Sequence, residues 1–470
     1  MSDAVLVIGG GVTGLRASLD LAKAGARVVL VERQPTIGGK MSSALDEDTP
    51  DPAIFGGLQP PRMEAVGQQP NIEVLTLSEV VGLKGEPGKF AVTIQQRARY
   101  VSDACIRCGH CRQVCPVVQP NEFDAGLAFR KAIYSPLRNS VPHAYVIDIE
   151  HCLNTPPNYL ACDRCVQVCE DDCIDFSVHP VETLEREVAS VVVATGFDVS
   201  QPDNLTRLGY GRHPDVLTAM ELERLLSSNG PTVGFVERPS CRREPTRVLI
   251  VLLDTSRFGW GYTARHTARL ADQGVAKISV LYDNQAAFTQ GLAEYWQRTA
   301  AEGVNLLWGA AEEITPADDG DVTVRYRDGN SGLARTNAYD LVVIAAPVEP
   351  ADGIEDLAAT LGVDVTADGF VKLVEMEFGR TITTRSGVYV AGCATGPKNM
   401  ADSIIEASTA AGNALRYVSY AAQEKEQERT NGRTGMLIGG KLLSQDELQK
   451  RIEGLLLNIM ERGSSPPRQS

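Results

Sequence analysis

Short apolar runs and one amphipathic segment alternate at the start of the chain. Ala4–Ile8 is wholly apolar, Leu15–Ala24 has the apolar spacing of a helix, and Arg27–Glu32 is a second apolar run that ends in an acid. Buried strands separated by a helix are typical of a parallel sheet. The pattern therefore predicts a strand–helix–strand unit and places the chain in the α/β class.

Apolar runs of the same kind recur far downstream. Strands are expected at Ala189–Ala194 and Gly387–Ala391, where they would belong to the domain that begins at residue 1. Between them, Arg247–Asp254, Tyr262–Gln273 and Lys277–Tyr282 predict a second strand–helix–strand unit. The first domain is therefore expected to be discontinuous, with a middle domain interrupting it.

Residues 421–470 change character. A charged stretch ends in turn residues near Gly432, and Leu442–Met460 then has apolar residues at helical spacing. Ser444 with Glu447 is a capping pair for that helix. The helix is expected to dock on a partner, with folding back on its own chain as the alternative, and residues 463–470 are expected to be disordered.

Composition narrows the class of protein. The 470 residues suffice for two or three domains with cores of their own. A net charge of −15 argues against nucleic-acid binding, which needs a basic surface. The N-terminus has no secretory signal, and no apolar run approaches the ~20 residues of a membrane span. We therefore expect a cytoplasmic protein with no transmembrane segment.

A glycine pattern follows the first strand. Gly9, Gly11 and Gly14 fill a G-x-G-x-x-G frame, which allows a tight turn, close approach to a pyrophosphate and helix–strand packing. The N-terminus of the following helix would face the phosphates. Glu32, at the end of the next strand, can accept bonds from ribose hydroxyls. These features predict a dinucleotide site, but the frame alone does not separate FAD from NAD.

The middle domain lacks this frame. The turn after Arg247–Asp254 contains no G-x-G-x-x-G, so phosphates could not approach that backbone as closely. We expect a domain that kept the fold of an NAD(P) domain and lost its nucleotide. Direct NAD(P)H binding is the alternative.

Nine of the eleven cysteines fall between Cys105 and Cys173. The first four follow the C-x2-C-x2-C-x3-C-P spacing of iron–sulfur ferredoxins, in which the fourth cysteine usually ligates the neighbouring cluster. Two [4Fe–4S] cubes need eight ligands, and the expected pairing is Cys105, Cys108, Cys111 and Cys169 for the first cube and Cys115, Cys152, Cys162 and Cys165 for the second. Cys173 is then spare, although it could replace Cys169.

Structural zinc and disulfides are the alternatives for these cysteines. Zinc sites prefer two C-x2-C pairs, often with histidine, and do not need the run observed here. Disulfides need an oxidising compartment. Both fit the cysteine pattern less well than two cubes.

Several segments resemble two-dinucleotide-binding-domain flavoproteins, which favours FAD. They are the Gly38–Gly39 pair, the strand ending in Ala194–Gly196 and the Gly392–Cys393 strand end. The expected cofactor-binding residues are Gly9, Gly11, Val12, Thr13, Gly14, Glu32, Arg33, Gly39, Lys40, Met41, Ala194, Thr195, Gly196, Gly392, Cys393, Lys398, Asp402 and Ser403.

The last of these residues have expected roles of their own. Asp402 or Ser403 would cap a helix whose N-terminus faces the flavin. Lys398 would tune the flavin by stabilising its reduced, anionic form, and a solvated loop lysine is the alternative. Cys393 is expected to be a packed small residue.

At family level, the chain resembles the HdrA family of heterodisulfide reductases and its QmoA-like and sulfur-oxidation relatives. The most specific segment is 129–148, which is similar to the family's RKAIY-x-P…Y-x-ID element, and 392–411 resembles its AGC…GPK…AS-x-AA segment. The resemblance covers roughly residues 3–420. It implies a thioredoxin-reductase-like, two-dinucleotide-binding-domain α/β fold with an inserted two-cluster ferredoxin-like domain.

Two departures from the family pattern stand out. The family's cysteine pair before a Pro-Lys-Met element is absent from 52–63, and its middle cysteine group is reduced to Cys241. An additional cluster site of larger relatives is therefore expected to be missing, which puts flavin-based electron bifurcation in doubt.

The resemblance implies an oxidoreductase subunit that passes electrons between FAD and two [4Fe–4S] clusters in thiol, disulfide or sulfur-compound metabolism. HdrB/HdrC-like subunits are the expected partners, with a homodimeric core as a further expectation. The rival functions are a free-standing NAD(P)H-dependent reductase and a zinc-containing scaffold.

The domain boundaries follow from these segments. They are 1–100 for the first part of the FAD-binding domain, 101–178 for the inserted ferredoxin-like domain, 179–240 for an FAD-domain segment and linker, 241–345 for the NAD(P)-domain-like fold, 346–420 for the last part of the FAD-binding domain, and 421–470 for the charged linker, helix and tail.

Overall fold

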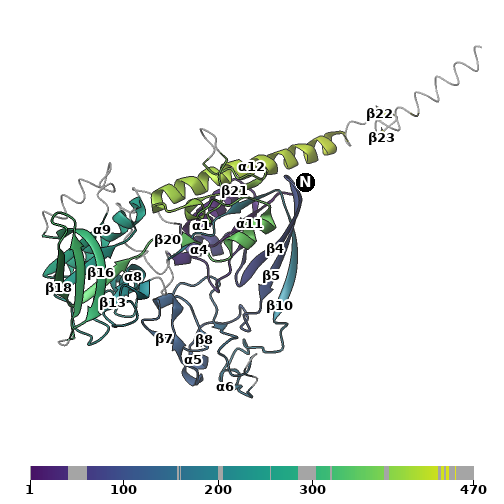
Figure 1. Ribbon diagram of the computed structural model, residues 1–470. Coiled ribbons are helices and arrows are strands. Elements are labelled where there is room, and N and C mark those ends of the chain that lie inside the picture. Colours follow the sequence, from purple (N-terminus) through teal and green to yellow (C-terminus); the bar gives the residue numbers. More distant parts are fainter. Residues whose placement is uncertain are drawn as a thin grey trace, which may run out of the picture.

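The computed structural model describes most of the chain, and two large sheets, one parallel and one mixed, organise it (Figure 1). The described residues are 2–40, 61–155, 158, 160–199, 205–254, 256–283, 303–317, 320–374, 380–431, 436–438, 441–443 and 450, with only the backbone given for 257 and 419–443. No helix in these ranges is both long enough and apolar enough to cross a membrane.

The first sheet is parallel throughout its described part. Its five strands have the order β21-β11-β1-β2-β3, and they are β1 (Ala4–Ile8), β2 (Arg27–Val31), β3 (Ile72–Leu75), β11 (Ser190–Val193) and β21 (Val388–Val390). Apolar runs form these strands because helices or strands cover both faces of the sheet. Strands from the beginning, the middle and the end of the chain therefore build one domain.

Helices cover one face of this sheet. They are α1 (Val12–Lys23), α4 (Met63–Gly67) and α12 (Met400–Asn431). α1 packs against α12 in a core that includes Leu15, Leu19, Ala407 and Ala411. The far end of α12 extends beyond the body of the molecule in Figure 1.

A three-stranded antiparallel sheet and α11 (Ile354–Leu361) cover the other face. Its order is β10-β5-β4, with β4 at Ser78–Glu86, β5 at Lys89–Arg97 and β10 at Val181–Val188. Alternate residues of β5 are buried, as expected for a strand with one face in a core. β5 and β10 pair directly although more than eighty residues of sequence separate them. In this pairing Arg97 lies opposite Val181.

The segment between β5 and β10 contains little regular structure and carries nine cysteines. Its elements are α5 (His110–Val114), β6 (Gln119–Pro120), η1 (Glu122–Asp124), β7 (Phe129–Arg130), β8 (Ile133–Tyr134), β9 (Val146–Ile147) and α6 (Arg164–Gln167). We call residues 98–180 the cysteine module. Its own buried cluster contains few apolar side chains besides the cysteines, including Tyr100, Ile133, Tyr145 and Ile147.

The second large sheet forms the middle domain. Within the described residues it has seven strands in the order β13-β19-β14-β15-β16-β17-β18, and the pairs from β13 to β16 are parallel. They are β13 (Val216–Thr218), β14 (Arg247–Leu252), β15 (Lys277–Tyr282), β16 (Asn305–Pro316), β17 (Val322–Asp328), β18 (Ala334–Tyr339) and β19 (Leu341–Ala345). Helices α8 (Ala219–Leu226) and α9 (Arg257–Asp272) pack on one face around buried Trp260.

Two short strands join the domains. β12 (Phe197–Val199) leaves the first sheet, β20 (Val348–Pro350) returns to it, and the two pair with each other. The remaining described elements are η3 (Gly392–Thr395) and the strand pair β22 (Met436–Ile438) and β23 (Lys441–Leu443).

The α/β class and the two parallel units predicted from the apolar pattern are confirmed by these sheets. Two helix starts were predicted too late. α1 begins at Val12, directly after the glycine turn, and α9 begins at Arg257 because the Ser256 hydroxyl accepts a bond from the Gly259 amide at 3.2 Å. Leu442, expected at the start of a C-terminal helix, lies in β23, while most of that segment lies outside the described residues.

Candidate functional site

Three close approaches bring the glycine segments together at the carboxyl edge of the first sheet. A side chain at Gly9 would overlap the carbonyl of Ala194, and one at Gly392 would overlap the Thr13 hydroxyl. A Cβ at Gly39 would lie 2.8 Å from the Cα of Gly11. Segments separated by hundreds of residues therefore meet around the N-terminus of α1.

The N-terminus of α1 itself is open. Gly11 is its N-cap. Among the residues that the structure describes, no side chain caps the helix and a Cβ at Gly11 would find nothing within 4 Å. Uncapped amides at a helix start are donors for an anion. The space beside Gly11 and these donors fit a pyrophosphate.

Glu32 lies at the end of β2 beside the glycine turn. Its carboxylate accepts bonds from the Gly10 amide at 2.6 Å and the Gln34 amide at 2.8 Å. Burial raises the pKa of the Glu32 carboxyl, and these amides oppose the shift. Each carboxylate oxygen retains a second lone pair, so the group can also accept from a hydroxyl.

The strand end at Ala194–Gly196 contributes an unsatisfied polar atom. The Thr195 hydroxyl oxygen is shielded from solvent and has no hydrogen-bond partner among the described residues. Buried polar atoms rarely stay unpaired in a complete structure. A bound cofactor with polar edges would satisfy it, which fits the expected FAD site.

The structure gives Lys398 partners within its own loop. Its ammonium donates to the Gly392 carbonyl at 3.2 Å and to the Thr395 hydroxyl, and it pairs with Glu406 at 3.2 Å. The Glu406 carboxylate also accepts from the Gly392 amide at 3.0 Å. Lys398 therefore holds η3 and the start of α12 together. Its predicted contact with the flavin stays a prediction.

Cys393 is buried beside this lysine. Its thiol lies 3.4 Å from the Lys398 carbonyl, and burial raises the pKa of the thiol. These surroundings are those of the packed small residue expected from the sequence.

Arg33 and Lys40 contact the domain connection. Lys40 forms an ion pair with Asp198 of β12 at 2.6 Å, and Arg33 lies 3.6 Å from the same carboxylate. The other Asp198 oxygen accepts from the Asp352 amide at 2.7 Å. Neither cation is free in this arrangement, and Met41 lies outside the described residues.

The capping residue of α12 differs from the expectation. The helix begins at Met400, and the Asn399 side chain accepts from the Asp402 amide at 2.7 Å. Ser403 instead donates to the Asn399 carbonyl at 2.9 Å. Asp402 and Ser403 therefore lie in the first turn, because asparagine also makes a good cap and Asn399 lies three residues before Asp402.

Four cysteines of the first predicted set lie near one another. Burial raises the pKa of the Cys111 thiol to about 11, and the charges of Cys105, Cys108 and Cys169 add to the shift. Arg107, between the first two cysteines, has a φ of 58°, a left-handed conformation that is rare outside glycine. The loop is thus bent tightly around this group.

The second predicted set lines a common cavity. Cys115, Cys152, Cys162 and Cys165 line it with apolar residues that include Val117, Ile133 and Leu153. Burial raises the pKa of the Cys165 thiol to about 12, with Cys152 adding to the shift, and the pKa of Cys152 is raised by burial and by Cys115 and Cys162. α5 and α6 pack together, so the two sets adjoin.

The ninth cysteine lies next to the first set. The Cys173 amide donates to the Cys169 sulfur at 3.4 Å, and the Cys173 side chain is buried. Among the described residues, no group of three or more His, Cys, Asp or Glu side chains is arranged to hold a single metal ion.

Hydrogen bonds join the glycine loop to the cysteine module. The Ile37 amide donates to the Val141 carbonyl at 3.2 Å, and the Val141 amide donates to the Thr36 hydroxyl at 3.0 Å. Arg107 in turn donates to the carbonyls of Leu137 and Arg138 at 3.0 and 2.9 Å. One short segment therefore connects the loop before Gly38–Gly39 with the first cysteine set.

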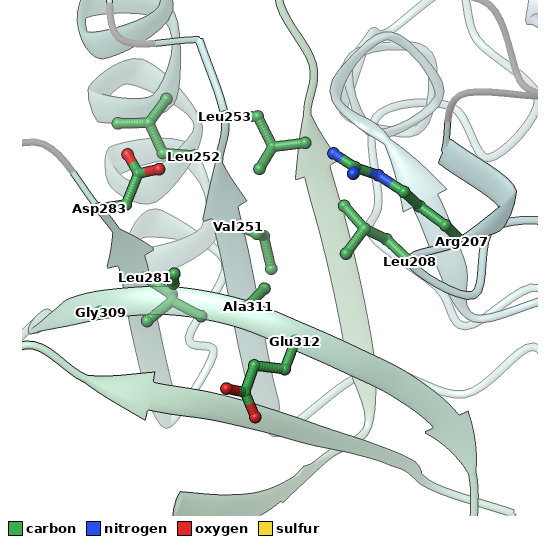
Figure 2. Close-up of a pocket in the computed structure, with 11 residues that line it drawn as sticks. Arg207, Leu208, Val251, Leu252, Leu253, Leu281, Asp283, Gly309, Ala311 and Glu312 are labelled. Carbon is green, nitrogen blue, oxygen red and sulfur yellow. The ribbon is translucent and has the colours of Figure 1, made fainter. Parts of the chain in front are cut away.

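The turn after β14 in the middle domain is filled by protein. Asp254 is buried, its carboxylate accepts from the Ser256 amide at 2.9 Å, and a side chain at Gly259 would overlap Asp254. A carboxylate at this helix start opposes a phosphate. A neighbouring pocket at the ends of β14 and β15, beside the middle of β16, is bordered by Asp283, Glu312 and Arg207 (Figure 2).

Sequence reasoning missed Asp198 and Arg99, which contact the loop after Glu32. The Arg99 guanidinium donates to the Pro35 carbonyl at 2.5 Å and to the Thr76 hydroxyl at 2.8 Å. Arg99 follows the polar end of a strand, and Asp198 follows a glycine turn. From the sequence alone, both positions would be predicted to be exposed to solvent. Only the tertiary fold brings them to the loop.

Comparison with known proteins adds independent evidence. The model of a family described as FAD dependent oxidoreductase matches residues 4–53. The A subunit of an H2:CoB-CoM heterodisulfide,ferredoxin reductase from Methanothermobacter marburgensis is 35% identical over 428 residues, which cover 88% of this chain and 64% of that protein. The first of two iron-sulfur A subunits of CoB–CoM heterodisulfide reductase from Methanopyrus kandleri is 37% identical over 433 residues, with the same shares covered.

The chain spans less than two thirds of the length of these relatives. Among solved structures, the thioredoxin reductase of Lactococcus lactis aligns with a TM-score of 0.49 and 15% identity, over 89% of this chain and 99% of that one.

Proposed function

From its homology with the A subunits of heterodisulfide reductases, we propose that this chain is an electron-transferring oxidoreductase subunit that binds FAD and two [4Fe–4S] clusters. The resemblance predicted from the sequence motifs is confirmed by identities of 32–37% over 88% of the chain. The hydrogen bonds that join Thr36 and Ile37 to Val141 carry the proposal, because they link the glycine-built site to the cysteines.

FAD would be held by the segments that converge on α1. Its pyrophosphate would lie at the open start of α1 beside Gly11, with a ribose at Glu32 and the Thr195 hydroxyl as a further donor. Gly39, Gly392 and Cys393 would border it, and Lys398 would act on the flavin only by exchanging one of its present partners. Bound FAD supplies exchange of one or two electrons.

The cubes would be held by the two cysteine sets, Cys105, Cys108, Cys111 and Cys169 for the first and Cys115, Cys152, Cys162 and Cys165 for the second. The electrostatic neighbours of Cys111 and Cys152 support this pairing, while Cys165 has a neighbour in each set. Cluster binding would also stabilise the cysteine module, whose own apolar core is small.

The connections suggest an order for the two cubes. Arg107, which lies between two cysteines of the first set, donates to the Leu137 carbonyl. The first set therefore adjoins the segment that is hydrogen-bonded to the glycine loop. The second lines a cavity with Leu153, and the carbonyl of Leu153 accepts a bond from the amide of exposed Leu160 at 2.7 Å. The first cube would therefore be nearer the flavin, and the second would exchange electrons with a partner.

The domain boundaries given above, including 101–178 for the inserted ferredoxin-like domain, are part of the proposal. So are HdrB/HdrC-like partner subunits, a homodimeric core, a role in thiol, disulfide or sulfur-compound metabolism, and a cytoplasmic location. The relatives are named as subunits of heterodisulfide reductases, which supports the expectation of partners.

The test is anaerobic purification of the full chain followed by cofactor analysis. We expect one FAD and about eight iron and eight sulfide per chain. Replacing Cys169 by serine should remove about half of the iron, whereas Cys173→Ser should leave it unchanged. Reversed results for these two variants would make Cys173 the ligand. Zinc in place of iron, or a wild-type chain without flavin, would contradict the proposed function.

A further inference from the structure

Thr36, a buried residue just before the Gly38–Gly39 pair, bonds directly to the cysteine module. Its hydroxyl oxygen accepts from the Val141 amide at 3.0 Å and lies 3.2 Å from the Val141 carbonyl. The Ile37 amide donates to the same carbonyl at 3.2 Å. Thr36 and Ile37 therefore hold Val141 by both of its backbone polar groups.

The same loop contacts the glycine turn before α1. Ile37 is buried, and a Cβ at Gly10 would lie 2.8 Å from the Cγ2 atom of Ile37. The Gly38 amide donates to the Gly10 carbonyl at 2.7 Å, and the Gly10 amide donates to Glu32 at 2.6 Å. A displacement of Thr36 and Ile37 would therefore be felt at the turn that is proposed to hold FAD.

On the other side of Thr36, residues 137–141 form a compact turn, which we call the bridge. The Ser140 hydroxyl oxygen accepts from the Leu137 amide at 2.8 Å and lies 2.8 Å from the Leu137 carbonyl. The Val141 side chain packs against α4, because a Cβ at Gly67 would lie 2.9 Å from its Cγ1 atom. The bridge is thus held by its own hydrogen bonds and by the first domain.

Arg107 connects the bridge to the first cysteine set. Its guanidinium donates to the Leu137 and Arg138 carbonyls at 3.0 and 2.9 Å, and its own position lies between Cys105 and Cys108. The module has a small apolar core, so a ligated cube is expected to order this loop. The Arg107 bonds would then depend on the cube.

Resting on the proposed function, we propose that FAD binding and assembly of the first cube are cooperative, and that Thr36 is the positioning residue that couples them through the bridge. The cube orders the Arg107 loop, this loop holds the bridge, and the bridge holds Thr36 and Ile37 beside the glycine turn. FAD then binds a loop whose ordering no longer costs conformational entropy. The ligating thiols release their protons to solvent, and the coupling itself transfers no electron.

The test measures the dissociation constant of FAD by equilibrium dialysis, in the anaerobically purified and deflavinated full chain, with and without the first cube. Cys105→Ser combined with Cys108→Ser removes the first cube, and Cys162→Ser, which disables the second set, is the control. Loss of the first cube should weaken FAD binding at least ~5-fold. Loss of the second should change it little, because Arg107 lies in the loop of the first set. Equal affinities with and without the first cube would overturn the inference.

Thr36 variants test whether the coupling runs through the bridge. Thr36→Val removes the hydroxyl bonds at nearly constant side-chain volume, and Thr36→Ser retains the hydroxyl. Thr36→Val should bring the ratio of the two dissociation constants close to one, whereas Thr36→Ser should keep the wild-type ratio. A merely local effect of Thr36→Val on FAD would change both constants alike and leave the ratio unaltered, which would overturn the role of Thr36.

Arg107→Gln approaches the coupling from the other end of the bridge. It should also lower the ratio, whereas Arg112→Gln, which removes an exposed positive charge from the same loop, should not. If Thr36→Val does not fold, an unchanged ratio in Arg107→Gln overturns the inference.

The coupling can also be measured in reverse on the wild-type chain, because FAD must stabilise the first cube by the same factor. At equilibrium with a fixed concentration of chelator, the chain should retain more iron with FAD than without it. If the double cysteine variant does not fold, equal retention overturns the inference. A wild-type chain that takes up no FAD or no cubes would instead overturn the proposed function, so the two failures are distinguishable.

Discussion

Gly11 and Gly14 lie one helical turn apart and are glycines for different reasons. A side chain at Gly14 would overlap the Gly9 carbonyl, so this position is fixed by packing of α1 against the turn. Gly11 has φ −74°, open to any residue, and a Cβ there would meet no atom of the described part of the chain within 4 Å. The sequence frame treats the two alike, but only Gly11 faces space left for a ligand.

Gly11→Val should therefore leave the fold of the apoprotein intact and weaken FAD binding at least ~10-fold, because the side chain enters the pyrophosphate space. Gly14→Val should cost about 1–3 kcal/mol of folding free energy through overpacking. Thermal unfolding of the apoproteins and titration of FAD by flavin fluorescence separate the two effects. Unchanged FAD affinity in Gly11→Val would show that no phosphate crosses this turn.

At the scale of single residues, spacing was informative where chemistry repeats at a fixed interval. The intervals between Cys105 and Cys169 led to two sets, and this pairing stays a prediction. Cys111 has Cys105, Cys108 and Cys169 as electrostatic neighbours, whereas Cys165 has one neighbour in each set, Cys152 and Cys111. Asn399 as a cap, Asp198 as an ion-pair partner and Arg99 as a half-buried cation were not predictable. Each depends on which distant segment folds over it, and no local pattern encodes that.

Among the elements, the β12–β20 pair connects two domains and depends on one carboxylate. Lys40, the Asp352 amide and Arg33 hold the pKa of the Asp198 carboxyl below its usual range, although burial alone would raise it. A carboxyl whose pKa is lowered in the folded state stabilises the protein above its unfolded pKa of about 3.9, and loses that effect as the pH falls through the folded value.

Asp198→Asn should therefore reduce the free energy of unfolding by roughly 1 kcal/mol at pH 7, a modest figure because Lys40 is 40% exposed. The difference from wild type should shrink as the pH falls below about 4. Denaturant unfolding across this pH range, at equal cofactor loading, measures it. Exposed Asp368→Asn is the control, and a difference that persists in acid would exclude the ion pair as its cause.

Element types were predictable because periodicity follows burial, whereas element ends depend on single caps. The apolar runs at Ala4–Ile8 and Lys277–Tyr282 coincide with β1 and β15 residue for residue. α9 extends five residues further toward its N-terminus than predicted, into Phe258 and Trp260, because Ser256 caps it. A segment that looked like a loop is thus the first turn of a buried helix.

For the whole molecule, the two dinucleotide-type units differ at the same structural position. In the first, the turn before α1 is open beside Gly11, whereas in the second it is filled by Asp254 and α9. We expect NADH and NADPH not to reduce the flavin of the isolated chain at a saturable rate, because phosphate binding at Asp254 is opposed. Stopped-flow absorbance measures this, with chemical reduction as the positive control. Saturable reduction by either nucleotide would support a free-standing reductase.

The pairing of β5 with β10 has a consequence for gene fusion and for protein engineering at this position. Arg97, the last residue of β5, lies opposite Val181, the first residue of β10. The backbone therefore leaves the antiparallel sheet and re-enters it at neighbouring positions, as at the tip of a β-hairpin. The strand ladder behind them continues through Val188↔Phe90 without interruption. A gene fusion at this point could exchange one inserted segment for another while every rung of the ladder stays in register.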